Sequence, residues 1–215
     1  MRKWISTIAL GLLGTLLLSA CNLFGPPSNP GHLGEEPTVQ GKVQNWTGEE
    51  AQVQVITLPG WTEIAQGTID SQGEFQLRLK TPPEQALETF DNSAPPGCES
   101  NLQISDNNAK FSTALFAVVN DGNQTGYLLL ANKLAESEFE NGLKTGGYMY
   151  VDRNFSAKGT VTCTGENQQT VFNVNFNFAK GWNLTISETT VSGTKRSIKA
   201  YIGDPGDLKW WYKSH

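Results

Sequence analysis

Apolar and polar side chains alternate along most of the chain, in short runs separated by turn residues. The clearest example is residues 74–80, where Phe75, Leu77 and Leu79 alternate with charged and amide side chains. A period of two residues places one face of a strand in the core and the other in water. The pattern therefore predicts an all-β protein.

The alternating runs fall into two regions. Residues 38–81 are typical of a small antiparallel sheet, with a turn at residues 70–73. Residues 111–202 hold seven short apolar stretches separated by turns rich in glycine and asparagine, a spacing typical of a sandwich or a partly closed barrel. We expect antiparallel β-sandwich modules, two of them packed together or in tandem. Phe172, Val174, Phe176 and Phe178 should face a core.

A connector lies between the two regions. Pro82-Pro83 followed by residues 84–88 predicts a short helical segment, because proline fits the first turn of a helix.

The opening of the first region resembles small β-sandwich modules of the transthyretin-like or carboxypeptidase-regulatory type. Gly41-Lys42-Val43 matches their Gly-x-Val opening strand, and residues 70–75 match their Asp-x-x-Gly-x-Phe turn. The resemblance is confined to residues 38–81. It implies an accessory module and not a catalytic one.

The N-terminus has the pattern of an export signal. Arg2 and Lys3 form a basic head, residues 5–18 are mostly apolar, and two small residues precede Cys21. A basic head, a short apolar core and a small-residue cleavage site are typical of a signal peptide. The apolar run is shorter than the roughly 20 residues that a spanning helix needs.

Leu18-Ser19-Ala20-Cys21 resembles the lipobox of bacterial lipoproteins. The resemblance implies cleavage before Cys21 and attachment of lipid, palmitate included, to that residue. It implies a lipid-anchored protein of the bacterial cell envelope, and Asn22 favours the outer membrane in a cell that has two. The alternative is a secretory peptide with a chance cysteine. Residues 147–184 also look like segments of uncharacterised β-rich envelope lipoproteins.

These features divide the chain into five parts. They are a signal peptide at 1–20, the lipidated cysteine and a flexible tether at 21–37, a small β-sandwich-like module at 38–81, a connector at 82–110, and a larger β-sandwich or partly closed barrel at 111–215. The tether is rich in Gly, Pro, Asn and Ser, and we interpret His32 within it as solvated.

The charge excludes one class of partner. The full chain has a net charge of −5, and removal of residues 1–20 leaves 14 basic and 21 acidic residues, a net charge of −7. Nucleic-acid-binding proteins carry basic patches, so we expect no nucleic acid. The expected contacts are the membrane, through the lipid on Cys21, and a candidate envelope protein partner.

Two cysteines remain after lipidation of Cys21. Outside the cytosol Cys98 and Cys163 are expected to form a disulfide, with two buried free thiols as the alternative. Closing a loop of roughly 66 residues would stabilise the fold by about 4 kcal/mol in the chain-entropy model.

Histidine usage argues against most catalytic sites. The two histidines are His32, in the tether, and His215, the last residue. A Ser-His-Asp triad or a zinc site needs such residues inside the folded body. The sequence also lacks a Gly-x-Ser-x-Gly elbow, a phosphate loop and the Gly-x-Trp signature of lipocalins. We expect no enzyme, no cofactor and no metal.

Carboxylates leave two alternatives open. The fold brings the two carboxylates of a glycosidase together, whatever their separation in the sequence. A carboxylate-based hydrolase therefore stays a third hypothesis. Asp70 and Asp204 could supply oxygens to calcium, but we interpret both as caps of turns.

The aromatic tail is the candidate binding surface. Trp210, Trp211 and Tyr212, flanked by lysines, could stack on sugar rings or enter a membrane interface. The alternative is a final strand with one buried tryptophan.

The leading hypothesis is a non-catalytic envelope lipoprotein with an interaction or structural role. The alternative is a lipoprotein that binds a carbohydrate or a small apolar molecule.

Overall fold

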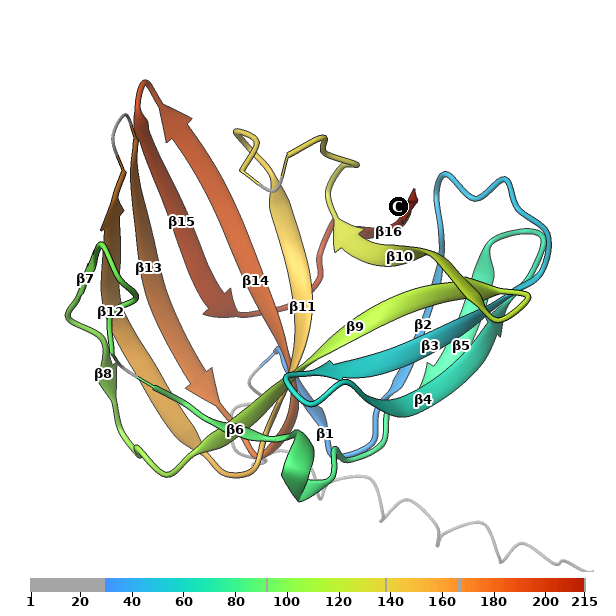
Figure 1. Ribbon diagram of the computed structural model, residues 1–215, viewed down its shortest axis with the longest axis horizontal. Coiled ribbons are helices and arrows are strands. Elements are labelled where there is room, and N and C mark those ends of the chain that lie inside the picture. Colours follow the sequence, from blue (N-terminus) through green and yellow to red (C-terminus); the bar gives the residue numbers. More distant parts are fainter. Residues whose placement is uncertain (1–29, 92, 138, 166–167, 215) are drawn as a thin grey trace, which may run out of the picture.

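The computed structural model describes residues 30–91, 93–137, 139–165 and 168–214 (Figure 1). The prediction of an all-β protein is confirmed, because one mixed sheet contains 16 strands. The pairings are antiparallel except for β13 with β15 and a single parallel bridge between Val43 and Trp210. No helix that could span a membrane occurs within these residues.

In chain order the elements are β1 (His32–Gly34), β2 (Thr38–Lys42), β3 (Ala51–Leu58), β4 (Thr62–Ile69), β5 (Glu74–Arg78), the 3₁₀ turn η1 (Glu84–Ala86), β6 (Glu88–Thr89), β7 (Cys98–Ser100), β8 (Gln103–Ile104), β9 (Lys110–Asn120), β10 (Asn123–Ala131), β11 (Lys144–Val151), β12 (Phe155–Thr164), β13 (Gln169–Phe178), β14 (Gly181–Ser192), β15 (Lys195–Ile202) and β16 (Lys209–Ser214).

One half of the molecule is a closed ring of strands, in the order β2, β5, β4, β3, β9, β10 and β16. The segment after β2 completes the ring by running beside β16. The Gln44 amide donates to the Trp210 carbonyl at 2.9 Å, and the Asn45 side chain exchanges two hydrogen bonds of 2.8 Å with the Tyr212 backbone. The last strand therefore closes the first half of the fold, which we call the ring.

Alternation along the strands fills the ring. In β3, buried and half-buried residues alternate without a break, and Val53 and Val55 are fully buried. They share a core with Leu128, Leu130 and Trp210. Burying apolar surface at about 25 cal/mol per Å² is the main force that holds such a core together.

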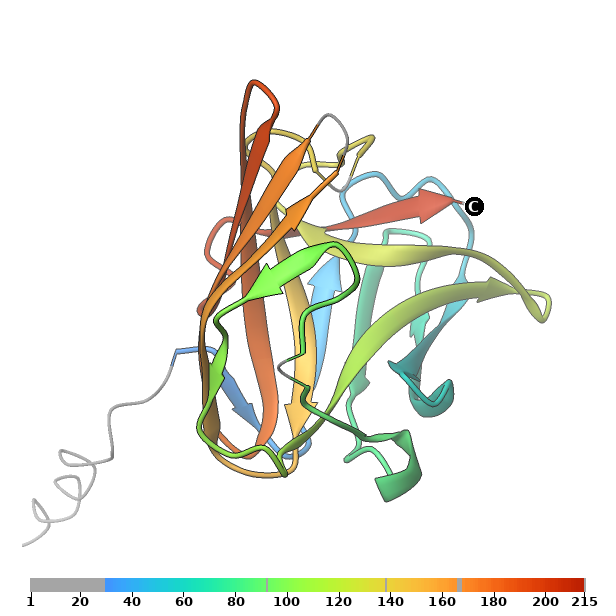
Figure 2. The same cartoon turned by 60° about the vertical axis from the view of Figure 1, so that its left-hand side comes forward.

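The other half is a twisted sheet that we call the curved sheet, formed by β11, β14, β15, β13 and β12 (Figures 1 and 2). Strand β9 joins the halves. Its residues 113–119 pair with β3, whereas residues 111–114 pair with β11. The pairing thus crosses the boundaries of the predicted parts 38–81 and 111–215, and both contribute to one ring.

Part of the connector packs against the inner face of the curved sheet. The predicted helical segment is the single turn η1. Phe90 follows it and contacts Phe111 and Phe155 at centroid distances of 5.2 and 5.4 Å. Phe178 is buried in the same cluster and Phe176 packs against it, as predicted for this face of β13.

The disulfide prediction is confirmed. Cys98 and Cys163 are directly paired residues of β7 and β12, with an S–S distance of 1.99 Å. The bond attaches the short edge strand β7 to the curved sheet.

The prediction of a flexible tether is wrong for its last part. His32 pairs with Asn183 and Gly34 with Trp182, so that β1 adds to the edge of β14. Glu35 also forms an ion pair of 2.8 Å with Lys180. The pairing of β14 with β15 begins only at Thr185, so the backbone groups of the preceding β14 residues are free on that side and can pair with β1. The signal peptide and Cys21 lie outside the described residues.

Candidate functional site

An apolar cleft lies between the outer face of β10 and the inner face of the curved sheet. Its volume is about 410 Å³. The lining residues come from β10, the β10–β11 loop, β11, β13, β14, β15 and β16, and they are Tyr127, Leu129, Ala131, Lys133, Ala135, Ser137, Phe139, Leu143, Thr145, Gly146, Phe172, Ser187, Thr189, Ile198, Ala200 and Lys213. The volume falls within the roughly 300–1,000 Å³ typical of small-molecule sites.

Strand β10 forms one wall because it is apolar on both faces. Leu128 and Leu130 point into the ring and are buried. The intervening Tyr127, Leu129 and Ala131 point the other way and line the cleft. A continuous apolar run of this kind is typical of a strand covered on both sides. The run is therefore a sequence signal that β10 is covered on both faces.

The inner face of the curved sheet forms the opposite wall. Phe172 of β13 pairs with Ile198 of β15, which in turn pairs with Thr189 of β14. These three neighbours lie on one face, because directly paired residues point to the same side of a sheet. Phe172, predicted to face a core, therefore lines the cleft.

The β10–β11 loop, residues 132–143, closes one end of the cleft. Asn132 is bonded across the loop, donating to the Gly142 carbonyl at 3.0 Å and accepting from the Lys144 amide at 3.0 Å. The Asn141 side chain accepts from the Val191 amide of β14 at 2.9 Å. These bonds fix the loop against the curved sheet, so the cleft has walls on three sides.

Polar groups form the smaller part of the cleft lining. Ser187 and Thr145 are directly paired on β14 and β11 and offer hydroxyl groups. Lys133 is ion-paired with Glu140. Lys213 is half-buried at the Tyr127 end. Among the described residues no carboxylate oxygen lies within 4.0 Å of its ammonium group.

The aromatic tail predicted as a binding surface has a different place in the structure. Trp210 is only 6 % exposed and packs between Phe75 and Phe116 inside the ring, at centroid distances of 5.2 and 5.0 Å. Trp211 and Tyr212 are half-buried. Their side chains donate to the carbonyls of Ala131 and Thr125, both at 3.0 Å. The tail is thus the strand that closes the ring, with one buried tryptophan.

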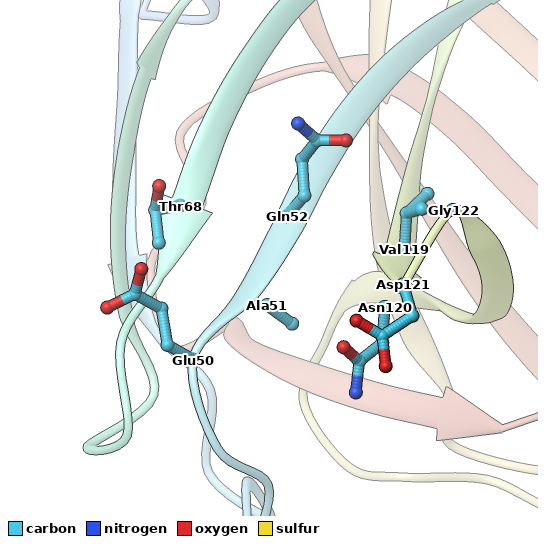
Figure 3. A pocket seen from close by; sticks show the side chains of 8 residues that line it. All are labelled: Glu50, Ala51, Gln52, Thr68, Val119, Asn120, Asp121 and Gly122. Carbon is cyan, nitrogen blue, oxygen red and sulfur yellow. The ribbon is translucent and has the colours of Figure 1, made fainter.

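A second hollow, of about 370 Å³, lies at the end of the ring where β3 begins and β9 turns into β10. Figure 3 shows Glu50 on one side of it, Asp121 on the other and Gln52 between them. Both carboxylates are exposed. The hollow therefore lacks the water-excluded setting in which pairs of carboxylates act as acid and base.

The two aspartates considered for calcium cap turns instead. One oxygen of Asp70 accepts from the amides of Gln72 and Glu74, at 2.8 and 2.9 Å. Asp204 accepts from the Gly206 amide at 2.8 Å. These are local side-chain-to-backbone bonds of the kind that Asp favours in turns.

Two tyrosines outside the cleft have strongly raised pKa values. Burial raises the pKa of Tyr148, which stacks on Trp210, to about 12. For Tyr201, burial first and then the hydrogen bond of 2.7 Å to Glu188 raise the pKa to about 12. Both rings pack against the ring core, and both phenols stay neutral at physiological pH.

Comparison with family models, with curated proteins and with solved structures finds no match for this chain. The functional interpretation therefore depends on the sequence motifs and on the geometry of the cleft.

Proposed function

We propose that the protein is a non-catalytic, lipid-anchored binding protein of the bacterial cell envelope, which holds a small apolar ligand in the cleft. The observation that carries the proposal is the apolar lining contributed by β10, β13 and β15 around a volume of about 410 Å³. Apolar pockets with a few placed polar groups are the usual form of a small-molecule site.

The energetics favour an apolar ligand over a carbohydrate. Each CH₂ group moved from water into the cleft contributes about 0.8 kcal/mol. Sugars are bound mainly by hydrogen bonds and by exposed aromatic faces. The three aromatic residues considered for that role form the closing strand of the ring. Ligand binding, the alternative hypothesis from the sequence, thus becomes the preferred function.

The position of the cleft fits an anchored protein. The β10–β11 loop lies at the end of the molecule opposite to β1 in both views (Figures 1 and 2). Cys21 lies 11 positions before His32, the first residue of β1, and a fully extended chain of that length spans at most about 38 Å. A lipid on Cys21 would hold the β1 end near the membrane and leave the cleft facing away from it.

The binding proposal can be tested on the mature chain, residues 21–215, secreted with Cys21→Ser. A neutral apolar dye such as Nile red should bind saturably, with one site per chain. Leu129→Gln places an amide in the wall, and Ser187→Phe fills the cleft, so each should weaken binding at least about tenfold. Leu134→Gln is the matched control, because Leu134 lies on the β10–β11 loop, is 43 % exposed and does not line the cleft. Absence of saturable binding by the unsubstituted cleft would refute the proposal.

The anchor can be tested separately in cells. Feeding an alkyne-tagged palmitate should label the full-length protein, and Cys21→Ser should abolish the label. A label that persists in this variant, or none in the native chain, would contradict lipidation at Cys21.

An interaction role is the second candidate, favoured by the outer face of the curved sheet. Asn173 and Asn175 of β13 are exposed there, and Asn173 donates to the Ser197 hydroxyl at 3.1 Å. A photo-crosslinking residue at position 175 should trap a partner in cells if this face binds a protein. The same residue at Leu134 is the control. Equal capture from both positions would argue against this face as an interface.

A further inference from the structure

The charge of the cleft differs from that of the chain. The protein has a net charge of −5, yet the described residues that line the cleft include two lysines and no carboxylate. Lys133 is neutralised by its ion pair with Glu140. Glu140 and Glu136 belong to the β10–β11 loop but do not line the cavity. Lys213 is therefore the cation that the described part of the cleft leaves for a ligand.

The lysine lies at one end of an apolar strip. Lys213 pairs with Tyr127, and from there Leu129 and Ala131 follow along the same face of β10. The four residue steps from Tyr127 to Ala131 span about 13 Å. Leu143 and Phe139 continue the apolar surface at the far end. A ligand that follows this wall would have its polar group beside Lys213 and its apolar part along β10.

The size restricts the apolar part. A cavity of about 410 Å³ lies near the lower limit of the roughly 300–1,000 Å³ found for small-molecule sites. One acyl chain can be accommodated there, whereas a phospholipid with two chains would leave much of its apolar surface in water.

We infer that the ligand is a single-chain amphiphile with an anionic group, whose anion pairs with Lys213 and whose acyl chain lies along Tyr127, Leu129 and Ala131. The inference rests on the proposed function of the cleft and adds the chemical class of its ligand. The anion can be the carboxylate of a free fatty acid or the phosphate of a single-chain phospholipid, since both provide oxygens to an ammonium group.

The test uses competition for the dye on the mature chain with Cys21→Ser. Dodecanoate, dodecanol and dodecyltrimethylammonium have the same chain and differ in the charge of the head. Below their critical micelle concentrations, we expect dodecanoate to displace Nile red at the lowest concentration and the cation at the highest. A further arm with lysophosphatidylglycerol distinguishes the two sources of the anion, because tighter binding of that lipid would identify the phosphate form.

A charge substitution makes the test specific. Lys213→Gln should weaken dodecanoate about fivefold, the usual scale of one charge-assisted contact at a partly exposed site. It should leave dodecanol unchanged. Lys209→Gln is the matched control, because Lys209 lies on the same strand, is exposed, and does not line the cleft. It should leave both ligands unchanged.

The outcomes separate the two proposals. Equal displacement by the acid, the alcohol and the cation would overturn the anionic class while the apolar site stands. Equal loss of dodecanoate and dodecanol in Lys213→Gln would also overturn it, since the lysine would then act through structure and not through charge. If the dye itself does not bind, the proposed function fails first.

Discussion

Trp210 links two strands of the ring and one strand of the curved sheet through a single side chain. Its indole contacts Phe75 of β5, Phe116 of β9 and Tyr148 of β11. It also lies where a Cβ on Gly41 would be placed, only 2.3 Å from the indole. Glycine at position 41 therefore allows β2 to approach the indole closely, which gives the Gly-x-Val pattern of the opening strand a packing reason.

Replacement of Trp210 by alanine should destabilise the fold strongly. A buried aromatic truncated to alanine loses its transfer free energy and leaves a cavity, together about 3–5 kcal/mol. The measurement is the free energy of unfolding from urea titration. Trp61→Ala is the control and should change stability by less than about 0.5 kcal/mol, because Trp61 is 73 % exposed. Similar losses from both variants would contradict the structure.

Tyr148 and Tyr201 should make stability depend on pH at alkaline values. Their pKa is about 12 in the folded chain against 10.0 for an ordinary tyrosine. The folded state therefore holds these protons more tightly. This contribution to stability is complete below about pH 10 and is lost as the pH rises toward 12. Urea unfolding at about pH 9 and pH 11 should show the decrease.

Tyr201→Phe isolates one of these two groups. The variant should lose less stability than the native chain between the two pH values, because one titrating group is gone. An equal loss in both proteins would show that Tyr201 does not contribute. The ultraviolet absorbance of tyrosinate in folded and urea-unfolded chains checks the sign independently.

Among the elements, regular strands could be predicted from the sequence and irregular ones could not. Strand β5 lies where the alternation of residues 74–80 placed it. Strand β4 does not show a regular alternation, because a bulge in its pairing interrupts it. Val55 pairs with Ala65 and Ile56 with Glu63, so that Ile64 is skipped. Ile64 and Ala65 are consequently both buried, which breaks the period of two.

The disulfide acts at the scale of one element, the edge strand β7. That strand has three residues, too few to hold by backbone pairing alone. Reduction should lower the free energy of unfolding by up to about 4 kcal/mol in the loop-entropy model, for a sequence separation of 65. Urea titration with and without reductant measures it. The double variant Cys98→Ser, Cys163→Ser should not respond to reductant, and a response there would assign the effect to something else.

For the molecule as a whole, local patterns could not predict the cleft. Its walls come from segments between Tyr127 and Lys213, and they meet only because β11 pairs with both β10 and β14. Strand β10 carries a continuous apolar run, but no single strand indicates which face of another strand it will meet. Which two apolar faces oppose each other depends on strand order, which the sequence did not specify. The same strand order brings residues of the predicted parts 38–81 and 111–215 into one ring.

The closing strand gives the sharpest test of this shared architecture. Strand β16 pairs with six residues of β10, from Gly126 to Ala131, and its Trp210 lies in the core. Deletion of residues 209–215 would open the ring and expose the edges of β10 and of the segment after β2. We expect the shortened chain to lose cooperative urea unfolding, although it retains every residue of the predicted module 38–81.

A synthetic peptide of residues 207–215 should restore cooperativity when added in excess, because it supplies the missing strand and the indole. The same peptide with Trp210→Ala is the matched control and should not restore it. Cooperative unfolding of the shortened chain without peptide would instead show that the two halves fold independently, as the original division of the chain implied.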